Sequence, residues 1–290
     1  MSVKVFDGTA FAEEIYKNLR SRVRKLKERG IVPGLAVIYG KGIPAAESYV
    51  RAKIRASMKT GVSCAVFPMS PLSGEKAYIE TVEQALKDKK IHALILVKPF
   101  PKKVDFEKLE ALVGSIKDAE GLNPFHFGRL FKARGLEEIK RKNTIVPATA
   151  LACAEIAKKL GSPLKGKRAL VIGRSNVVGK PTAHLLMMMD MTVTVAHSKT
   201  RNLKQEVQNA DLVISAVGHP NLIAGSWIKK GAVVIDAGTS HLHGKITGDV
   251  DFKGALKQAL WITPVPGGVG PVTTAFLLRN VVSLAEGVLR

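Results

Sequence analysis

Two kinds of hydrophobic pattern follow one another along the chain and predict helices and strands in turn. Apolar residues recur at helical spacing over residues 8–30, and a short apolar run of strand length follows at 34–40. The succession continues with helices expected at 45–60, 74–88 and 106–113 and strands at 63–67 and 92–97. Strands that alternate with helices favour an α/β fold with a parallel, doubly wound sheet.

The alternation starts again near residues 144–147, which predicts a second α/β unit. Helices are expected at 150–160, 181–189 and 203–209, and strands at 167–173, 192–196, 212–217 and 232–236. A long apolar helical pattern at 272–288 closes the chain. A length of 290 residues favours two domains, with one large α/β domain as the alternative.

The charge of the chain leaves two classes of function open. A formal net charge of +21 is typical of a nucleic-acid-binding module, but it also suits an enzyme with anionic ligands. The basic residues are scattered, mostly as pairs, and aromatic residues make up only 6% of the chain, so few side chains could stack on bases. Specific binding of nucleic acid is therefore not expected, and a solvated basic surface is the simpler interpretation.

The cysteine content and the hydropathy of the chain indicate in which cellular compartment the protein is found. Cys64 and Cys153 are too few for a disulfide framework and lack zinc-ligand spacing. The N-terminus does not have the pattern of a signal peptide, and no apolar run reaches the ~18 residues of a membrane span. We expect a cytoplasmic protein that does not bind membranes and whose cysteines are reduced.

Residues 171–181 carry the strongest local signal for a ligand. A predicted strand runs into a turn bounded by Gly173 and Gly179 and then into a helix. This arrangement directs free backbone N–H groups and a helix dipole toward a phosphate. The spacing is longer than the common dinucleotide motif, so a turn without a ligand is the alternative.

The end of the next strand indicates which dinucleotide fits. An NAD site places a carboxylate there for the ribose hydroxyl, but residues 196–201 offer only hydroxyls and cations. This chemistry favours the 2′-phosphate of NADP. Arg174 and Ser198 are the expected phosphate contacts.

A second candidate site lies on the helix expected at 45–60. Tyr49 and Lys53 are four residues apart and therefore share a helix face. A lysine beside a tyrosine in a cleft can transfer protons if burial lowers its pKa. Taken alone, the pair is also compatible with an ordinary solvated helix face.

Several longer motifs, taken together, resemble one enzyme family. They occur in this order: PAAESYVRAK at 44–53, KDAEGLNPFHFGRL at 117–130, LKGKRALVIGRSNVVGKPTAHLL at 164–186, and TPVPGGVGPVTTAFLLRN at 263–280. The chain closely resembles the bifunctional methylenetetrahydrofolate dehydrogenase/methenyltetrahydrofolate cyclohydrolase family over nearly its whole length.

The resemblance implies an architecture and a reaction. It implies an N-terminal folate-binding α/β domain (1–146 plus 272–290), a Rossmann-like NADP-binding domain (147–271), and a final helix that returns to the first domain. The implied enzyme oxidises 5,10-methylenetetrahydrofolate by hydride transfer to NADP and hydrolyses the methenyl product to 10-formyltetrahydrofolate. The implied partners are tetrahydrofolate derivatives, including polyglutamylated forms, and a second copy in a homodimer, with no metal.

The resemblance also assigns roles to residues. Lys53 matches the essential lysine, and Tyr49 matches the aromatic residue that stacks on the folate ring. The remaining matches bind substrate (Val97, Lys98, Glu120, Pro266, Gly267 and Gly268) or cofactor (Gly173, Arg174, Ser175, Val178, Gly179, Ser198, Thr200, Gly270 and Thr273).

Three departures from the family pattern concern the folate side. The glutamine that hydrogen-bonds the lysine is absent: Val97 takes its place without a gap, or Lys98 with a one-residue deletion. Glu120 stands for an aspartate that anchors the pterin, and residues 147–150 differ from the family's PCTP. Either replacement of the glutamine should lower the pKa of Lys53, by a like charge or by desolvation. The alternative is therefore a dehydrogenase-only or catalytically altered member.

Overall fold

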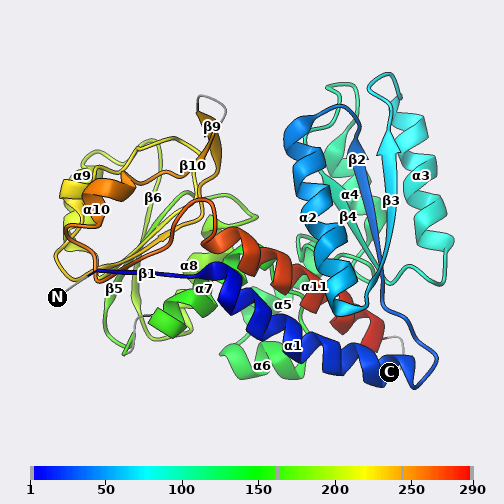
Figure 1. Ribbon diagram of the computed structural model, residues 1–290, viewed down its shortest axis with the longest axis horizontal. Coiled ribbons are helices and arrows are strands. Elements are labelled where there is room, and N and C mark those ends of the chain that lie inside the picture. The colour runs from blue at the N-terminus through cyan, green and yellow to red at the C-terminus, as the bar shows by residue number, and fades with distance from the viewer. Residues whose placement is uncertain (1–2, 161–162, 243–244, 288–290) are drawn as a thin grey trace. The chain divides into compact units, whose positions relative to one another are not determined.

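Two units, each with its own parallel sheet, make up the chain. The computed structural model describes residues 3–160, 163–242 and 245–287 (Figure 1). Contacts group residues 1–12, 130–142 and 147–276 into one unit, called here the six-stranded unit. Residues 13–129, 143–146 and 277–290 form the other, called the three-stranded unit.

The six-stranded unit contains a parallel sheet in the order β1-β11-β8-β7-β5-β6. The chain runs from β5 to the edge strand β6 and then returns to β7 on the other side of β5, so the strand order reverses beside β5. Ligands of such sheets bind at the carboxyl ends of the strands at this reversal. In sheet order the strands are Lys4–Val5, Trp261–Ile262, Val233–Asp236, Leu212–Ser215, Arg168–Ile172 and Thr192–Ala196.

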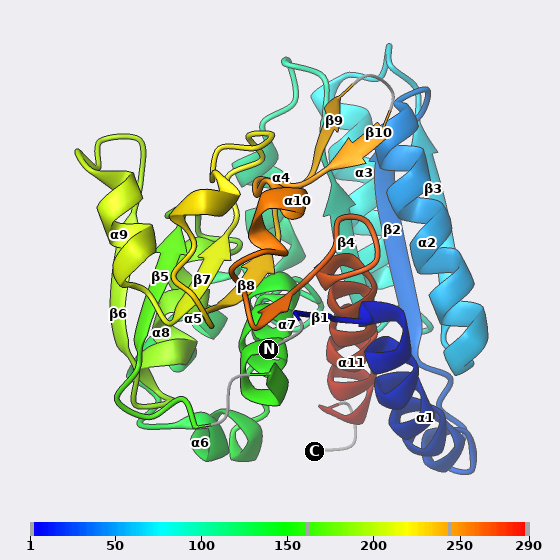
Figure 2. The ribbon, with the colours of Figure 1, turned by 60° about the vertical axis from the view of Figure 1, so that its left-hand side comes forward.

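Helices cover both faces of this sheet (Figure 2). On one face, Leu170 and Ile172 of β5 share a core with Val207 of α9 and Ala255 of α10. Helices α7 and α8 contact β8, β5 and β6. The bounds are α7 Ala148–Leu160, α8 Gly179–Met187, α9 Leu203–Asn209, α10 Phe252–Ala255 and a 3₁₀ turn, η1, at Gly225–Trp227; β9 (Ser240–Leu242) and β10 (Lys245–Thr247) form an antiparallel hairpin.

The three-stranded unit has the parallel order β3-β2-β4. Alternate residues of β2 and β4 on one face (Ala36, Ile38, Leu94 and Leu96) pack against α3 and α4, while α2 covers the opposite face (Figure 1). β2 and β4 are buried on both faces, which explains their continuous apolar runs, whereas the edge strand β3 is partly exposed. The bounds are β2 Gly34–Gly40, α2 Pro44–Thr60, β3 Ser63–Met69, α3 Glu75–Lys87, β4 Ala93–Val97 and α4 Phe106–Val113.

The first and last long helices each contribute residues to both units: α1 spans Gly8–Lys27 and α11 spans Val269–Gly287. Within the three-stranded unit, Arg22 of α1 donates hydrogen bonds to Ser283 at 2.9 Å and to Glu286 at 2.7 and 3.0 Å. The expected return of the final helix to the N-terminal part of the chain is confirmed.

The expected α/β class and the main elements are confirmed, with bounds shifted by a few residues. The pattern did not reveal α5 (Pro124–Lys132), α6 (Leu136–Arg141), α10, β1, β9, β10 or β11. The two units also group three segments differently from the predicted domains: residues 1–12, 130–142 and 272–276 belong with the six-stranded unit. One reason is the pairing of β1 with β11, through Lys4–Trp261 and Val5–Ile262.

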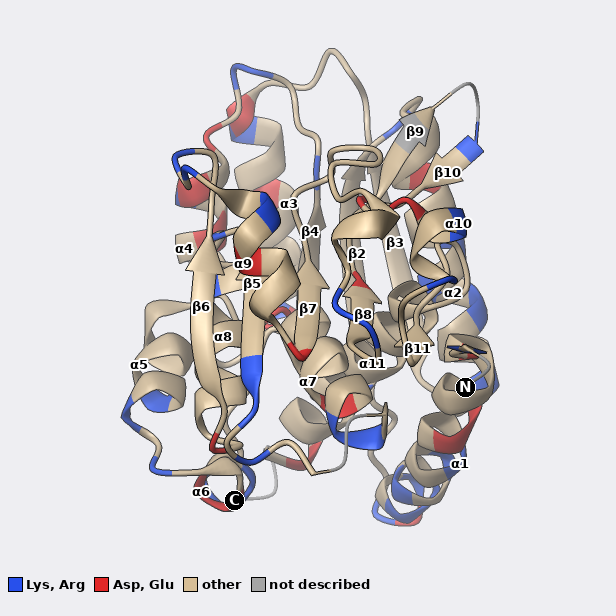
Figure 3. Cartoon of the chain, turned by 90° about the vertical axis from the view of Figure 1, so that its left-hand side faces the viewer, with Lys and Arg blue, Asp and Glu red and all other residues tan. Residues whose placement is uncertain are grey.

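Basic residues are spread over many elements and are interspersed with acidic ones on α1 (Figure 3). This agrees with the scattered pairs in the sequence. Among the described residues, no helix is long and apolar enough to cross a membrane.

Candidate functional site

The glycine turn after β5 is closely packed, and its two glycines are required for different reasons. Gly173 has φ +115°, and a Cβ there would lie 2.8 Å from the carbonyl oxygen of Ala216 after β7. A Cβ on Gly179 would lie 2.1 Å from the carbonyl oxygen of Gly173. The turn therefore folds back on itself at the strand-order reversal, where only glycine fits.

Residues 174–178 of this turn lead into the start of α8. Arg174 and Ser175 are exposed. The Ser175 hydroxyl accepts the backbone N–H of Val178 at 3.2 Å and that of Gly179 at 3.5 Å, which orders the turn. The exposed guanidinium and the positive end of the helix dipole make this end of the sheet attractive to a phosphate.

The loop after β6 forms a second ordered turn near the same strand ends. The backbone N–H of His197 donates to the Thr200 hydroxyl at 2.9 Å, and the N–H of Thr200 donates to the carbonyl oxygen of His197 at 2.8 Å. Ser198 and Lys199, between them, are exposed. The hydroxyl of Ser198 and the ammonium of Lys199 are therefore accessible at this turn.

The glycine-rich loop before α11 packs against the start of α1. The N–H of Gly8 donates to the carbonyl oxygen of Gly267 at 3.0 Å, and a Cβ on Gly8 would meet the carbonyl oxygen of Gly268 at 1.8 Å. Asp7 caps α1 by accepting the N–H groups of Thr9 and Ala10, both at 2.9 Å. The first helix thus supports the loop that contains the predicted residues Pro266, Gly267 and Gly268. Gly270 and the largely buried Thr273 follow in α11.

In the three-stranded unit, Tyr49 and Lys53 meet on one face of α2. The Lys53 Nζ lies 3.5 Å from the centre of the Tyr49 ring, a cation–π contact, and the Lys53 side chain is only 1% exposed. Burial lowers the pKa of Lys53 to about 7, although the charge of Glu120 raises it. Burial and Glu120 raise the pKa of the Tyr49 hydroxyl, so the tyrosine stays neutral.

Glu120 lies in a turn built by Asp118. The Asp118 carboxylate accepts the N–H groups of Glu120 at 3.0 Å, Gly121 at 2.9 Å and Asn123 at 2.7 Å. Burial, followed by the charges of Asp118 and Glu110, raises the pKa of Glu120 to about 7. A carboxyl group and an amine that both exchange protons near neutral pH therefore act on each other in this unit.

The two candidate replacements for the missing glutamine have different surroundings in the structure. Val97 is the last residue of β4 and is buried. The Lys98 Nζ instead lies 3.6 Å from the centre of the Phe106 ring. The lowered pKa of Lys53 was expected from either replacement, and its direction is confirmed, but its main cause is burial rather than repulsion from Lys98.

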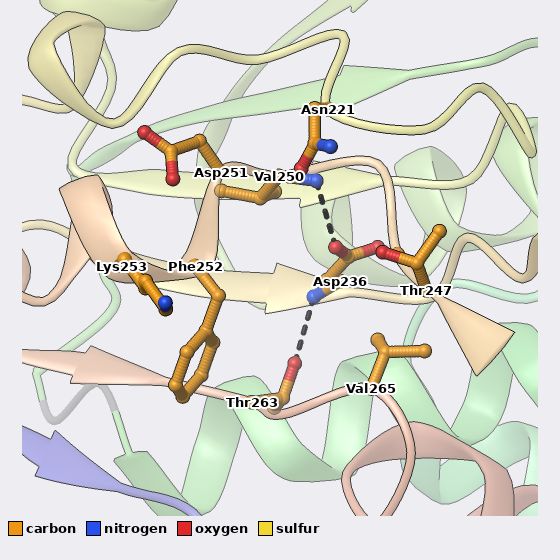
Figure 4. A pocket seen from close by; sticks show the side chains of 10 residues that line it. Asn221, Asp236, Thr247, Val250, Asp251, Phe252, Lys253, Thr263 and Val265 are labelled. Carbon is orange, nitrogen blue, oxygen red and sulfur yellow. Dashed lines mark hydrogen bonds between the residues drawn. The ribbon is translucent and has the colours of Figure 1, made fainter. Parts of the chain in front are cut away.

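A cavity of about 310 Å³ lies at the carboxyl ends of β8 and β11, and none of the predicted site residues lines it (Figure 4). Asp236 is buried there and accepts the N–H groups of Gly238 and Val250, both at 2.9 Å. Its own N–H donates to the Thr263 hydroxyl at 2.8 Å. Burial raises the pKa of Asp236 to about 6. No sequence spacing singled out this carboxylate, because two of its partners, Val250 and Thr263, lie 14 and 27 residues away.

The sheet topology, the glycine turn at the strand-order reversal and the buried lysine define a class: an α/β enzyme with a dinucleotide-type unit and a second unit with acid–base groups. Two family models match the chain, described as the tetrahydrofolate dehydrogenase/cyclohydrolase catalytic domain over residues 6–120 and its NAD(P)-binding domain over residues 147–288. The chain belongs to the tetrahydrofolate dehydrogenase/cyclohydrolase family.

Full-length relatives and solved structures agree with this assignment. The bifunctional protein FolD of Moorella thermoacetica is 40% identical over 287 residues, which is 99% of this chain and all of that one. The structure of the FolD enzyme from Campylobacter jejuni is 34% identical, with a TM-score of 0.91 and 99% coverage of both chains. The Trypanosoma brucei enzyme, solved with NADP and an inhibitor, is 35% identical, with a TM-score of 0.92 and coverage of 100% and 99%.

The predicted residues therefore fall into two groups. The cofactor residues and the segment 266–273 lie in the six-stranded unit, whereas Tyr49, Lys53, Val97, Lys98 and Glu120 lie in the three-stranded unit. Sequence reasoning missed Asp118, which orders the turn before Glu120, and Asn280 of α11, which donates hydrogen bonds to the carbonyl oxygens of Ala119 and Val146. Among the residues that the structure describes, no group of three or more His, Cys, Asp or Glu side chains could hold a metal ion.

Proposed function

We propose that this chain oxidises 5,10-methylenetetrahydrofolate to the methenyl form with NADP and then hydrolyses the product to 10-formyltetrahydrofolate. The observation that carries the proposal is the buried Lys53, packed on Tyr49 and charge-coupled to Glu120, in a chain that aligns end to end with bifunctional FolD relatives. A lysine with a pKa of about 7 can hold or release a proton at neutral pH, as hydrolysis of the methenyl bridge requires.

The cofactor half of the proposal rests on the turn after β5. Gly173 and Gly179 let the backbone approach a pyrophosphate, and Arg174 and Ser198 offer a guanidinium and a hydroxyl to a 2′-phosphate. Ser175, Val178 and Thr200 shape the two turns. When bound, NADP supplies the hydride acceptor.

The folate half of the proposal assigns one task to each group in the three-stranded unit. Tyr49 stacks on the pterin ring, Glu120 accepts hydrogen bonds from its N–H groups, and Lys53 serves proton transfer. Val97 and Lys98, at the end of β4, contribute packing and positive charge. In the six-stranded unit, the loop that closes over the reacting rings contains Pro266, Gly267 and Gly268, and Gly270 and Thr273 follow it in the first turns of α11.

The same proposal includes the two predicted domains, 1–146 plus 272–290 and 147–271. It also includes a homodimer, a cytoplasmic location and polyglutamylated substrates, all of which the family resemblance implies. A dehydrogenase-only member is the second candidate, because buried Val97 provides no hydrogen bond to Lys53.

Absorbance assays distinguish the two candidates. Methenyltetrahydrofolate formation from the methylene substrate and its decay are followed separately, with NADP and with NAD, in the wild type and Lys53→Met. We expect both steps in the wild type, faster with NADP, and loss of enzymatic decay in Lys53→Met. An enzyme that forms the methenyl product but never hydrolyses it faster than buffer would establish the dehydrogenase-only alternative. Absence of both steps would refute the proposed function.

A further inference from the structure

A buried carboxylate, that of Asp249, lies beside the loop that follows β7 in the six-stranded unit. Asp249 is fully buried. Its carboxylate accepts the hydroxyl of Ser215 at 2.7 Å and the N–H groups of Val217 at 2.9 Å and His219 at 2.8 Å. A buried anion is costly unless such donors surround it. Because all three donors come from the end of β7 and the residues after it, this one carboxylate fixes the course of the loop at 216–219.

The loop that follows β8 passes over the same carboxylate. A Cβ on Gly238 would lie 2.1 Å from a carboxylate oxygen of Asp249, so the backbone at this point approaches the acidic group closely. The hydroxyl of Ser240 donates to the carbonyl oxygen of Gly218 at 2.8 Å, which joins the loop after β8 to the loop after β7. Both loops are therefore built around Asp249.

The loop after β7 also packs against the glycine turn that is proposed to hold the pyrophosphate. The N–H of Ala216 donates to the carbonyl oxygen of Ile172, the last residue of β5, at 2.9 Å. A Cβ on Gly173 would lie 2.8 Å from the carbonyl oxygen of Ala216 and 3.4 Å from Cγ1 of Val217. The loop that Asp249 fixes is thus one wall of the expected dinucleotide site.

The order of the strands indicates which half of a dinucleotide this wall meets. β7 and β8 lie on one side of β5, and β6 lies on the other side. The proposed site places the pyrophosphate at the turn after β5 and the adenosine 2′-phosphate at Ser198, after β6. The nicotinamide half must then extend over the carboxyl ends of β7 and β8, where the loops around Asp249 lie.

We propose that Asp249 is a positioning residue of the dinucleotide site: its carboxylate holds the loops after β7 and β8 in the course that the nicotinamide half of the cofactor requires. Asp249 acts through the backbone of these loops and does not touch the cofactor. This inference rests on the proposed NADP binding and deepens it. Loss of the carboxylate should therefore weaken contacts with the nicotinamide half and spare those with the adenosine half.

The test compares NADPH with adenosine 2′,5′-bisphosphate, which has the adenosine and its 2′-phosphate but no nicotinamide. Asp249→Asn keeps the size of the side chain but replaces an acceptor oxygen with an NH₂ group, which cannot accept the donors of the loop. By calorimetric titration we expect NADPH binding to weaken roughly tenfold or more and adenosine 2′,5′-bisphosphate binding to change by less than about twofold. The fluorescence of bound NADPH, which depends on the surroundings of its ring, should shift toward that of free NADPH.

Asp251→Ala is the matched control for a general loss of stability. Asp251 lies two residues further along the chain and caps α10 by accepting the N–H of Gly254 at 3.1 Å. Loss of the cap should lower the melting temperature, but both ligands should bind as they do to the wild type. The inference is overturned if Asp249→Asn leaves NADPH binding unchanged, if it weakens both ligands equally, or if Asp251→Ala shows the same selective loss.

Ser215→Ala provides the decision should Asp249→Asn not fold. It removes the hydroxyl that donates to Asp249 at 2.7 Å and leaves the carboxylate in place. We expect the same selectivity with a smaller loss, and NADPH binding equal to that of the wild type would overturn the inference. A wild-type protein that binds neither ligand would refute the proposed function and this inference with it, whereas binding of both ligands without the selective loss would refute the inference alone.

Discussion

Arg174 is exposed on the glycine turn, and residues 196–201 at the end of β6 include no carboxylate that would repel a 2′-phosphate. A charge-assisted hydrogen bond of this kind contributes about 1.5–3 kcal/mol. We expect Arg174→Ala to weaken NADP binding by roughly 10- to 150-fold and to change NAD binding little, because NAD lacks the phosphate.

Calorimetric titration with each dinucleotide measures the effect of Arg174→Ala. Lys204→Ala is the control, since it removes an equal charge from an exposed position in the same unit. Equal losses for NADP and NAD, or a loss of the same size in the control, would show that Arg174 is not the phosphate contact.

Residues whose partners are close in the sequence could be predicted, and those with distant partners could not. The shared helix face of Tyr49 and Lys53 follows from their spacing, and their contact is confirmed, although their role was inferred from the family resemblance. Asn280 contacts Ala119, which is 161 residues away, so no local pattern shows its role. The sequence left Val97 and Lys98 as alternatives for the missing glutamine, because only folding determines that the Lys98 ammonium rests on Phe106.

At the scale of elements, the contact between β5 and α8 depends on Gly179. A Cβ at this position would lie 2.1 Å from the carbonyl oxygen of Gly173, and backbone cannot yield as a flexible side chain does. Overpacking of this kind costs about 1–3 kcal/mol. We therefore expect Gly179→Ala to lower the melting temperature and to weaken NADP and NAD binding together, because α8 must move away from the turn.

Gly128→Ala provides the matched control for Gly179→Ala. Gly128 lies within α5, and its added Cβ would meet no atom within 4 Å. Alanine is favoured over glycine inside a helix by roughly 0.5–1 kcal/mol, so this variant should be slightly more stable and should bind dinucleotides normally. A Gly179→Ala protein with unchanged stability and binding would contradict the close packing of the turn.

Helices and strands with a clear hydrophobic pattern could be predicted, whereas the shortest strands could not. The buried strands β2, β4 and β5 have apolar runs that fix their positions within a few residues. β1 and β11 contain two residues each, too few for any period, and they form only because they pair with each other and with β8. Tertiary pairing therefore places the N-terminal strand in the six-stranded unit.

The whole molecule has a net charge of +21. The proposed folate and dinucleotide sites do not explain this charge. The basic residues are dispersed (Figure 3), and salt bridges such as Arg24–Glu28 and Lys76–Glu80 are exposed pairs that contribute little to stability. A diffuse positive field attracts polyanions over distances of about a Debye length, roughly 10 Å at 0.1 M salt.

A folate with a polyglutamate tail is the polyanion that the proposed function brings to this chain. We expect the KM for a polyglutamylated methylene substrate to be lower than that for the monoglutamate at low salt, because the tail adds attraction without altering the reacting ring. The difference should shrink as salt rises, since screening weakens long-range attraction but leaves contacts with the buried Lys53 largely intact. Steady-state kinetics with both substrates measure both trends from about 0.02 to 0.5 M potassium chloride, a range over which the Debye length falls from roughly 20 Å to roughly 4 Å. Equal KM values at low salt would mean that the positive charge serves another purpose, whereas a salt-independent difference would point to specific contacts with the tail rather than to the field of the whole molecule.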